Sequence, residues 1–442
     1  LRGLPAAEVR ASLRLNPLGS PTLETAATVA RIPQIRAEFP HVSVLAVDTA
    51  PYAEAGAGGV LELALGLSAG VALLRAADAA EIAAAELAAA TEFTLAVGPD
   101  QFLEIARLRA ARRLWARVLE ACGVAPEARR SPLYVRTSRR MYSSLDPWVN
   151  LLRATTAAFA AAVGGADGLT VLPFDEPYGT GLATPGPLGR RIARNTQLLL
   201  SEESSLHRVA DPAGGSFYVE SLTDQLARSA WAEFQALEAA GGIEAVLADG
   251  TLAARLATVT RERQGEIATR RRSLTGVNQF PLLGDDGLER PHPDSEDAVG
   301  ASPVPQTGDG ELALTLVRDA AAFEALRERA GQLPAARLLL AATGPVAAHV
   351  NVVQWAKNFF EAGGVETVTQ TEDALEASGF AAAAVCVGKG SDPTAALAAL
   401  REAGVETIYA VGAEIDGLTR MQDGVDMVAA LGGLLDQLEE AR

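Results

Sequence analysis

The feature that most constrains the fold is the alternation of short apolar segments with long helical segments over residues 1–280. Residues 102–119 place apolar side chains at helical spacing on one face, with arginines over much of the rest. Candidate strands cover residues 42–48, 93–97, 133–137 and 169–174, and a fifth short strand is expected before Asp211. This rhythm predicts an α/β fold in which helices cover a parallel sheet, either open or closed into a barrel.

The number of strands leaves that choice open. A (β/α)8 barrel of the TIM type needs eight parallel strands, and the sequence offers about five. Either the sheet is open, or the first strands of a barrel precede Leu1. The chain does not begin with a methionine.

The remainder of the chain predicts a linker and a second α/β domain. Residues 282–311 are rich in Pro, Gly, Asp and Ser without periodicity, which indicates a linker. A helix is expected over residues 312–330. Strand-like segments follow at residues 337–342, 365–370, 381–387 and 407–411. Their spacing predicts a flavodoxin-like doubly wound sheet, so the predicted domains are residues 1–281 and 312–442.

The amino-acid composition limits the kinds of partner and the compartment that are expected for this chain. With 38 basic and 55 acidic residues the net charge is −17, which argues against nucleic acid and anionic membranes as partners. We expect no membrane-spanning segment, because no apolar run is judged long enough. Two cysteines, Cys122 and Cys386, are too far apart in sequence to indicate a disulfide framework, which favours the cytoplasm.

Three segments could carry chemistry, and each has a simpler interpretation. The acids of Phe174-Asp175-Glu176 follow a strand and could act in acid–base catalysis, or form a helix cap or ion pair. The glycines within residues 211–220 allow a ligand to approach closely, or only a turn. His349, expected before a helix that starts near Val350, could bind a metal or have no role. Phosphate-loop and zinc motifs are absent from the sequence.

The strand at residues 42–48 ends in Asp48 and runs into a loop that closes with Gly58-Gly59. Active sites of α/β barrels lie at such a junction. However, the residues between Asp48 and Glu54 include no strong acid, base or metal ligand.

Several stretches resemble the methylmalonyl-CoA mutase family. They are FLEIARLRAARRLWARVL (102–119), PFDE (173–176), RRIARNTQLLLSEESSLHRVADPAGGSFYVESLT (190–223) and TGVNQFP (275–281). The second α/β segment resembles the family's cobalamin-binding domain. The resemblance implies a TIM-type barrel whose first strands, about three of them, precede Leu1.

The resemblance also exposes losses in the barrel. Active members carry Tyr-His-x-Gln-Glu-Ala-Gly-Ala at the opening stretch. Aligned on Glu54, this chain has Ala50 for the tyrosine, Pro51 for the histidine and Ala53 for the glutamine. Tyr52 is the only nearby candidate proton donor, displaced by two positions. The segment 138–144 does not match the family's glutamine- and tryptophan-containing loop.

The cobalamin motif has changed in the same way. The family uses Asp-x-His-x-x-Gly, whose histidine ligates cobalt while the aspartate holds its other ring nitrogen. Here His349 is present as the candidate cobalt ligand, but the aspartate is replaced by Ala347 and the glycine by Val352. A glycine pair expected near the nucleotide tail reads Gly412-Ala413.

These losses imply a small, non-catalytic subunit that pairs with a catalytic large subunit in a heterodimeric isomerase. The large subunit would bind adenosylcobalamin, and this chain would bind none. The apolar helices of residues 58–91 are expected to contribute to the contact. Two alternatives stay open: an active acyl-CoA mutase with an atypical site, and a scaffold protein without a mutase partner.

Overall fold

The computed structural model describes residues 5–19, 23–178, 187–284, 314 and 316–441. The chain divides into two compact units. Unit 1 comprises residues 1–142, 150–260 and 291–318, and unit 2 comprises residues 143–149, 261–290 and 319–442. Residues 261–281, predicted as the end of the first domain, therefore group with unit 2. The predicted linker lies outside the described residues except for residues 282–284.

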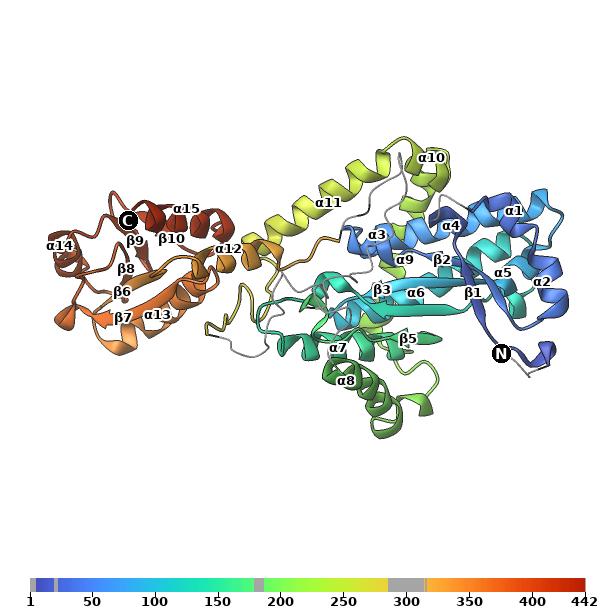
Figure 1. Cartoon of the computed structure of the whole chain (residues 1–442), viewed down its shortest axis with the longest axis horizontal. Coiled ribbons are helices and arrows are strands. Elements are labelled where there is room, and N and C mark those ends of the chain that lie inside the picture. The colour runs from blue at the N-terminus through green and yellow to red at the C-terminus, as the bar shows by residue number, and fades with distance from the viewer. Residues whose placement is uncertain (1–4, 20–22, 179–186, 285–313, 315, 442) are drawn as a thin grey trace. The chain divides into compact units, whose positions relative to one another are not determined.

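Unit 1 is built on a five-stranded parallel sheet (Figure 1). Its strands are β1 (Ser12–Leu15), β2 (Ser43–Asp48), β3 (Thr91–Val97), β4 (Leu133–Thr137) and β5 (Gly168–Thr170). They lie in sequence order, with Val47 opposite Phe93 and Leu95 opposite Val135. The sheet is the curled half of a TIM-type barrel, as the family resemblance implies, and its parallel strands confirm the prediction from the strand–helix alternation.

The structure confirms four predicted strands and corrects the fifth. Instead of a strand before Asp211, Leu206–Arg208 form a 3-10 helix, and Val209 is 59% exposed. The left-handed backbone of Ser205 (φ 56°) interrupts the segment, and no ladder among the described residues includes it. Strand β1, a four-residue edge strand with no apolar run, was not predicted.

The helices of unit 1 are α1 (Thr25–Val29), α2 (Ile32–Glu38), α3 (Ala50–Glu54), α4 (Gly59–Ala79), α5 (Ala84–Ala90), α6 (Gln101–Ala121), α7 (Val149–Val163), α8 (Pro187–Leu198), α9 (Phe217–Ala239) and α10 (Gly242–Ala248). Helix α11 (Thr251–Ala268) begins in unit 1, and its residues from 261 onward belong to unit 2. The helix predicted over residues 102–119 is α6, and α9 packs against both α4 and α6.

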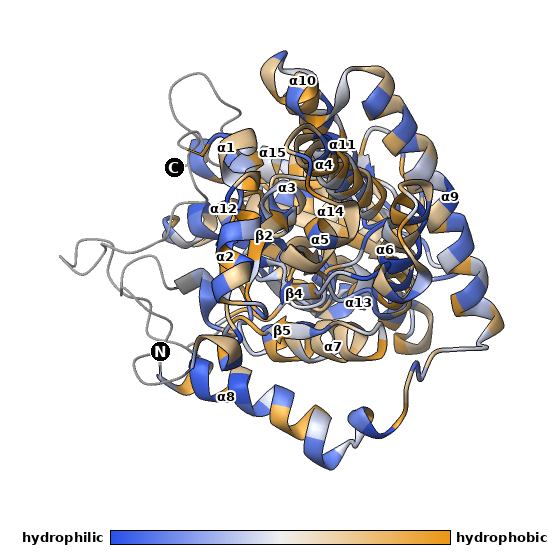
Figure 2. Ribbon diagram, turned by 90° about the vertical axis from the view of Figure 1, so that its right-hand side faces the viewer, coloured by the Kyte–Doolittle hydropathy of each residue, from blue (hydrophilic) through white to orange (hydrophobic). Residues whose placement is uncertain are grey.

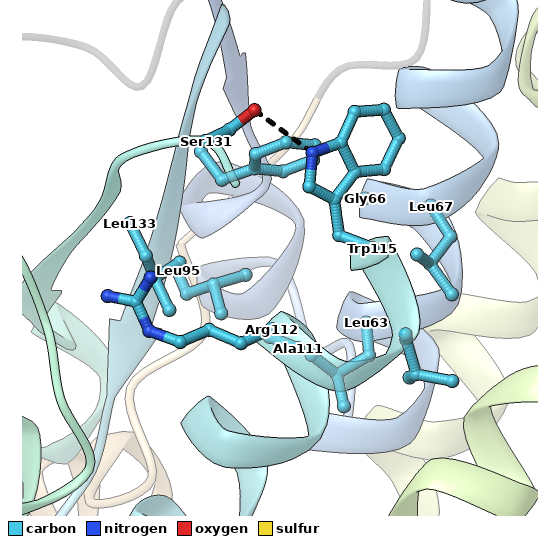
Figure 3. A pocket seen from close by; sticks show the side chains of 11 residues that line it. Leu63, Gly66, Leu67, Leu95, Ala111, Arg112, Trp115, Ser131 and Leu133 are labelled. Atoms are coloured by element: carbon cyan, nitrogen blue, oxygen red, sulfur yellow. Dashed lines mark hydrogen bonds between the residues drawn. The ribbon is translucent and has the colours of Figure 1, made fainter. Parts of the chain in front are cut away.

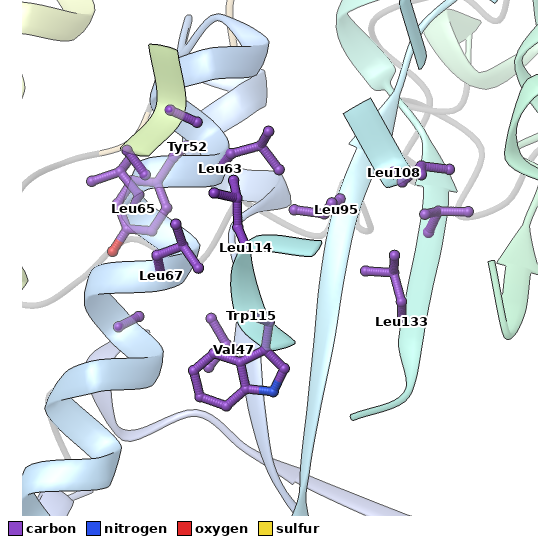
Figure 4. Packing of buried hydrophobic residues seen from close by; sticks show 14 of the residues in the cluster. Val47, Tyr52, Leu63, Leu65, Leu67, Leu95, Leu108, Leu114, Trp115 and Leu133 are labelled. Atoms are coloured by element: carbon purple, nitrogen blue, oxygen red, sulfur yellow. The ribbon is translucent and has the colours of Figure 1, made fainter. Parts of the chain in front are cut away.

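The main core lies between the sheet and these helices (Figure 4). Because side chains alternate along a strand, Leu95 and Val97 of β3 join this core, whereas Glu92 and Thr94 lie on the opposite face. Gly70 lets α4 and α6 approach closely, since a Cβ added there would lie 2.6 Å from the Trp115 ring.

Helix α4 overturns one expectation from composition. Its 21 residues are long and apolar enough to cross a membrane, so the expectation that no run reaches that length is wrong. However, 72% of its most apolar window is buried within the protein, as in the core helix of a globular unit. Figure 2 shows α4 as mostly hydrophobic, whereas α8 alternates between hydrophobic and hydrophilic residues. The apolar side chains of α4 are therefore mostly internal, and the contribution of residues 58–91 to a subunit contact stays a prediction.

Unit 2 contains a second five-stranded parallel sheet. Its strands are β6 (Arg337–Thr343), β7 (Glu366–Thr371), β8 (Ala382–Val387), β9 (Thr407–Val411) and β10 (Thr419–Met421). The order β7-β6-β8-β9-β10 is the flavodoxin-like order, which confirms the prediction and adds β10.

The helices of unit 2 are α12 (Ala321–Gly331), α13 (Val346–Glu361), α14 (Thr394–Glu402) and α15 (Met427–Glu440). The helix expected from residue 312 begins only at Ala321. Asp319, in the turn before it, is buried and paired with Arg263. That ion pair fixes a non-helical approach to α12.

Candidate functional site

The candidate site in unit 1 begins at the carboxyl end of β2. Asp48 ends the strand, and its Oδ1 accepts a hydrogen bond from the backbone N–H of Ala50, 3.1 Å away. Ala50 and Ala53 lie on α3 and form a small apolar cluster with Ala96 of β3. All three are at most 5% exposed. The positions that would hold the family's tyrosine and glutamine are therefore packed with methyl groups.

Tyr52 does not point toward this edge. Its side chain is 8% exposed and belongs to the main core, with whose residues Figure 4 draws it. Pro51, at the histidine position, has no side-chain donor or acceptor. At the positions where the sequence predicted the loss of reactive side chains, the structure therefore has apolar side chains. The nearby Tyr52 is enclosed by the core.

A network of ion pairs begins at Glu54, the last residue of the helix that carries Ala50 and Ala53. Glu54, fully buried, lies 2.9 Å from the Arg136 guanidinium and accepts a hydrogen bond from the Arg139 backbone N–H at 3.3 Å. The Arg139 side chain pairs with Glu176 at 2.9 Å. Burial raises the pKa of both Glu54 and Glu176, and the arginines partly oppose the rise. The loops after β2, β4 and β5 are therefore joined by ion pairs.

The structure shows the contacts of Asp175 and Glu176. Glu176 forms the loop ion pair with Arg139 and begins a 3-10 helix, Glu176–Tyr178. Asp175 is buried against α8, where a Cβ added at Gly189 would lie 1.9 Å from its Oδ1. These contacts fit the simpler interpretation, and the acid–base role stays a prediction.

A second buried cluster of charged side chains joins α4 and α6 to the carboxyl ends of β2 and β3. Arg107 of α6 lies between Glu62 of α4, at 2.5 Å, and Glu104, whose Oε2 accepts from Arg107 Nε at 2.7 Å. Glu62 also accepts from the Ala96 backbone N–H at 2.9 Å and from the Thr49 hydroxyl at 3.3 Å. Burial raises the pKa of Glu62 to about 7, while the two carboxylates keep Arg107 protonated.

Most of these ion-paired residues were not predicted, because the prediction of sites relied on the spacing of known motifs. Glu62, Glu92 and Arg107 lie inside segments that read as ordinary strand or helix. On the open face of the sheet, Arg14 of β1 pairs with Glu92 at 2.9 Å and with Thr94 at 2.9 Å. The one feature of the sequence that could have indicated this network is a charged residue within an apolar strand, as Glu92 is in β3.

The glycine-containing segment 211–220 comprises a turn at residues 211–216 and the first residues of α9. Arg109 of α6 pairs with Asp211 and, at 2.6 Å, with Glu220. Glu220 also accepts a hydrogen bond from the Gly215 backbone N–H at 3.1 Å. Gly215 has φ 81°, so it supplies a left-handed turn. These contacts attach the start of α9 to α6, which is the simpler predicted role.

The candidate site in unit 2 lies at the carboxyl end of β6. The helix expected near Val350 begins at Val346, directly after Pro345. His349 therefore lies within the first turn of α13 and is 6% exposed. Its Nδ1 lies 3.0 Å from the Gly344 carbonyl oxygen, which can only accept, so Nδ1 carries the proton.

The residues around His349 do not fit a cobalamin. Ala347 offers no carboxylate, and a backbone carbonyl takes the histidine proton instead. Val352 packs directly on the loop after β9, since a Cβ added at Gly412 would lie 2.8 Å from Val352 Cγ1. The histidine ring is enclosed, and the space beside Gly412 is filled. In the described part of the chain, no group of three His, Cys, Asp or Glu side chains could hold a metal ion.

A small apolar cavity lies between α4, α6 and the sheet (Figure 3). Leu63, Leu95 and Leu133 line it, and the Trp115 indole N–H donates to Ser131 Oγ at 2.9 Å. Its volume is about 40 Å³, far below the roughly 300–1,000 Å³ of small-molecule sites. It is a gap in packing and not a ligand site.

Together these features define a class: an α/β protein with a TIM-type half-barrel and a flavodoxin-like unit, whose strand ends are packed and ion-paired. Comparison with known proteins then identifies the family. Residues 20–301 match the family described as methylmalonyl-CoA mutase. The chain belongs to the methylmalonyl-CoA mutase family.

The relatives narrow the position within that family. The methylmalonyl-CoA mutase small subunit of Streptomyces virginiae is 41% identical over 97% of this chain and 71% of its own length. The small subunit of Propionibacterium freudenreichii subsp. shermanii is 33% identical over 91% of this chain and 64% of its own length. The methylmalonyl-CoA mutase of Cereibacter sphaeroides is 36% identical over 57% of this chain and 35% of its own length. The chain thus groups with the small subunits.

Proposed function

We propose that this chain is the non-catalytic small subunit of a heterodimeric methylmalonyl-CoA mutase. A large subunit would interconvert methylmalonyl-CoA and succinyl-CoA. The observation that carries the proposal is the alanine cluster at the end of β2. Ala50, Pro51 and Ala53 replace three side chains that the family resemblance assigns to the chemistry, and Ala50 and Ala53 pack against Ala96. General acid catalysis needs a donor within hydrogen-bond reach of the substrate, and these positions offer none.

The same reasoning assigns the cofactor to the partner. Adenosylcobalamin would be held by the large subunit, because His349 is enclosed and Val352 fills the space beside Gly412. This chain would hold no cobalt. It contributes isomerase activity only as part of the assembly, which we place in the cytoplasm. Both cysteines, Cys122 and Cys386, are free thiols, as a reducing compartment favours.

A second candidate is an active mutase with a different acid. Tyr52 is a poor substitute donor because the core encloses it. Glu54 and Glu176 have raised pKa values and lie beyond the strand ends, which favours them. Both, however, are paired with arginines. Turnover by the isolated chain, abolished by Glu54→Gln or Glu176→Gln, would support this candidate instead.

The partner should be a related chain. Paired subunits of related fold are expected to meet in a pseudo-symmetric contact. An obligate interface of this kind buries on the order of 2,000–5,000 Å². Neither nucleic acid nor a membrane surface is expected as a partner of a chain with net charge −17.

Coexpression with a large subunit that retains Tyr-His and Asp-x-His-x-x-Gly tests the proposal. We expect a one-to-one complex by size-exclusion chromatography, with turnover of methylmalonyl-CoA by the complex and none by this chain alone. Pro51→His in the complex should leave the rate unchanged within a few-fold. A chain that ignores the large subunit at micromolar concentration would favour a partnerless scaffold, and turnover by the isolated chain would reject the non-catalytic role.

A further inference from the structure

A basic groove runs along the outer surface of unit 1, between α6 and α9. Its volume is about 630 Å³, within the roughly 300–1,000 Å³ range of small-molecule sites. Five lining residues bear on the argument: Arg113 and Arg117 of α6, Arg129 beyond its end, and Arg228 and Trp231 of α9. None of them has a part in the strand-end sites.

The charge of the groove is opposite to that of the protein. Four guanidinium groups meet two carboxylates, which leaves an excess of two positive charges in a chain of net charge −17. Asp224 pairs with Arg113 at 3.0 Å and with Arg228 at 2.7 Å. Glu120 pairs with Arg117 at 2.5 Å and with Arg129 at 2.8 Å. Each acid is thus shared by two arginines.

The arginines retain donors for a ligand. A guanidinium carries five N–H donors, and each ion pair here is formed through a single guanidinium nitrogen. The side chains of Arg113, Arg117 and Arg228 are 58%, 62% and 79% exposed. The acids hold these guanidinium groups along the groove, and the pKa of each acid is lowered by its arginines. Several arginines in such an arrangement favour phosphate, which accepts paired hydrogen bonds.

Trp231 indicates which phosphate compound fits. Its indole is partly buried: it lines the groove among the arginines and packs against the main core and against Phe234, with ring centroids 5.2 Å apart. Indole and guanidinium planes both stack on nucleobases. An acidic peptide would use the arginines without needing an indole, and the groove is of small-molecule size.

We propose that the groove between α6 and α9 binds a nucleoside polyphosphate, with its phosphates on Arg113, Arg117 and Arg228 and its base against Trp231. This site goes beyond the proposed subunit role, since it lies apart from the strand ends. Binding would attach a nucleotide to the outer surface of the subunit.

Calorimetric titration of the full chain, alone or coexpressed with its large subunit, tests the proposal. The probes are ATP, ADP, adenosine, inorganic triphosphate, coenzyme A and a short glutamate peptide. We expect saturable binding of ATP and ADP that weakens with salt, and weaker binding of triphosphate. Binding of coenzyme A with the same dependence on the arginines supports the shared nucleotide chemistry.

Variants separate the two parts of the site. Arg117→Gln with Arg228→Gln should weaken both ATP and triphosphate by about tenfold or more. Trp231→Leu should weaken ATP but leave triphosphate unchanged. The control is Arg401→Gln on α14, which removes an exposed arginine elsewhere and should change neither. Circular dichroism verifies that each variant is folded.

Three results would overturn the proposal. They are no saturable nucleotide binding at millimolar concentrations, nucleotide binding that the arginine variants leave intact, and binding of the glutamate peptide or of coenzyme A without binding of ADP.

Discussion

The carboxyl ends of the two sheets are filled in different ways. In unit 1, alanines occupy the reacting positions, while ion pairs around Glu54 and Arg107 still join the loops. In unit 2, an aliphatic side chain, Val352, closes the space beside Gly412, and a backbone carbonyl takes the proton of His349. The first edge therefore depends on paired charges for its shape, and the second on apolar packing.

The difference carries a physical lesson. Replacing a reacting side chain with alanine leaves the surrounding buried charges in place, because removing one member of a buried network exposes the others to an unfavourable environment. A pocket with no such network can be closed by one larger apolar residue. We therefore expect the two edges to respond oppositely to substitution.

Breaking the charged edge should produce the largest effect. Arg107→Met leaves Glu62 and Glu104 facing each other without their cation, and Glu62 is 2% exposed. The expected loss in free energy of unfolding is about 3–5 kcal/mol, measured by urea denaturation. The matched control in unit 2 is Arg329→Met, which breaks partly exposed pairs with Asp436 and Glu439 and should cost at most about 1 kcal/mol. Equal losses in the two variants would contradict the comparison.

Opening the apolar edge should restore part of a cofactor site. Ala347→Asp with Val352→Gly returns the family's acid and clears the space beside Gly412. Because a partner of a ligating histidine typically changes metal affinity by about 10–100-fold, we expect the double variant to bind adenosylcobalamin at least about tenfold more tightly. Absorbance titration against the parent chain measures this. An unchanged affinity would show that Val352 and Ala347 do not limit binding.

The pH dependence of stability sharpens the account of the charged edge. Burial raises the pKa of Glu62 from 4.5 to about 7, so the native state holds this proton more tightly than the unfolded chain. That contribution is present below about pH 4.5 and is lost as the pH rises through about 7. Relative to Glu62→Gln, the parent chain should lose on the order of 1–2 kcal/mol between about pH 5 and about pH 8.

Urea unfolding at both pH values measures that loss. Glu366→Gln on β7 serves as the control, because it removes an exposed carboxylate outside the cluster. If Glu62→Gln and the parent chain changed in parallel with pH, Glu62 would not titrate in this range and the buried cluster would have to be reinterpreted.

Much of the architecture could be predicted from sequence, since runs of apolar or of β-branched residues mark β2, β3, β4 and the longer strands of unit 2. The segment before Asp211 misled because Val209 and Ala210 suggest a strand, whereas a strand also needs a neighbour. Strand β1 was invisible because its four residues carry no apolar run.

Some features of the candidate sites could likewise be predicted from sequence, and others could not. The losses at Ala50, Pro51, Ala347 and Val352 were predicted from motif positions, and the structure adds what fills those positions. The partners of Glu54 and Glu62 could not be predicted, because they come from strands and helices distant in sequence. The start of α13 also differed, since Pro345 and the following alanines extend the helix over His349.

The most direct test of the central claim is the cobalamin content of the coexpressed heterodimer. Purified complex is saturated with adenosylcobalamin, freed of excess, and its bound cobalamin is quantified by absorbance against protein concentration. We predict one cobalamin per heterodimer, removed entirely when the histidine of the large subunit's Asp-x-His-x-x-Gly is replaced, and unaffected by His349→Ala in this chain. Two cobalamins per heterodimer, with one lost on His349→Ala, would contradict the account.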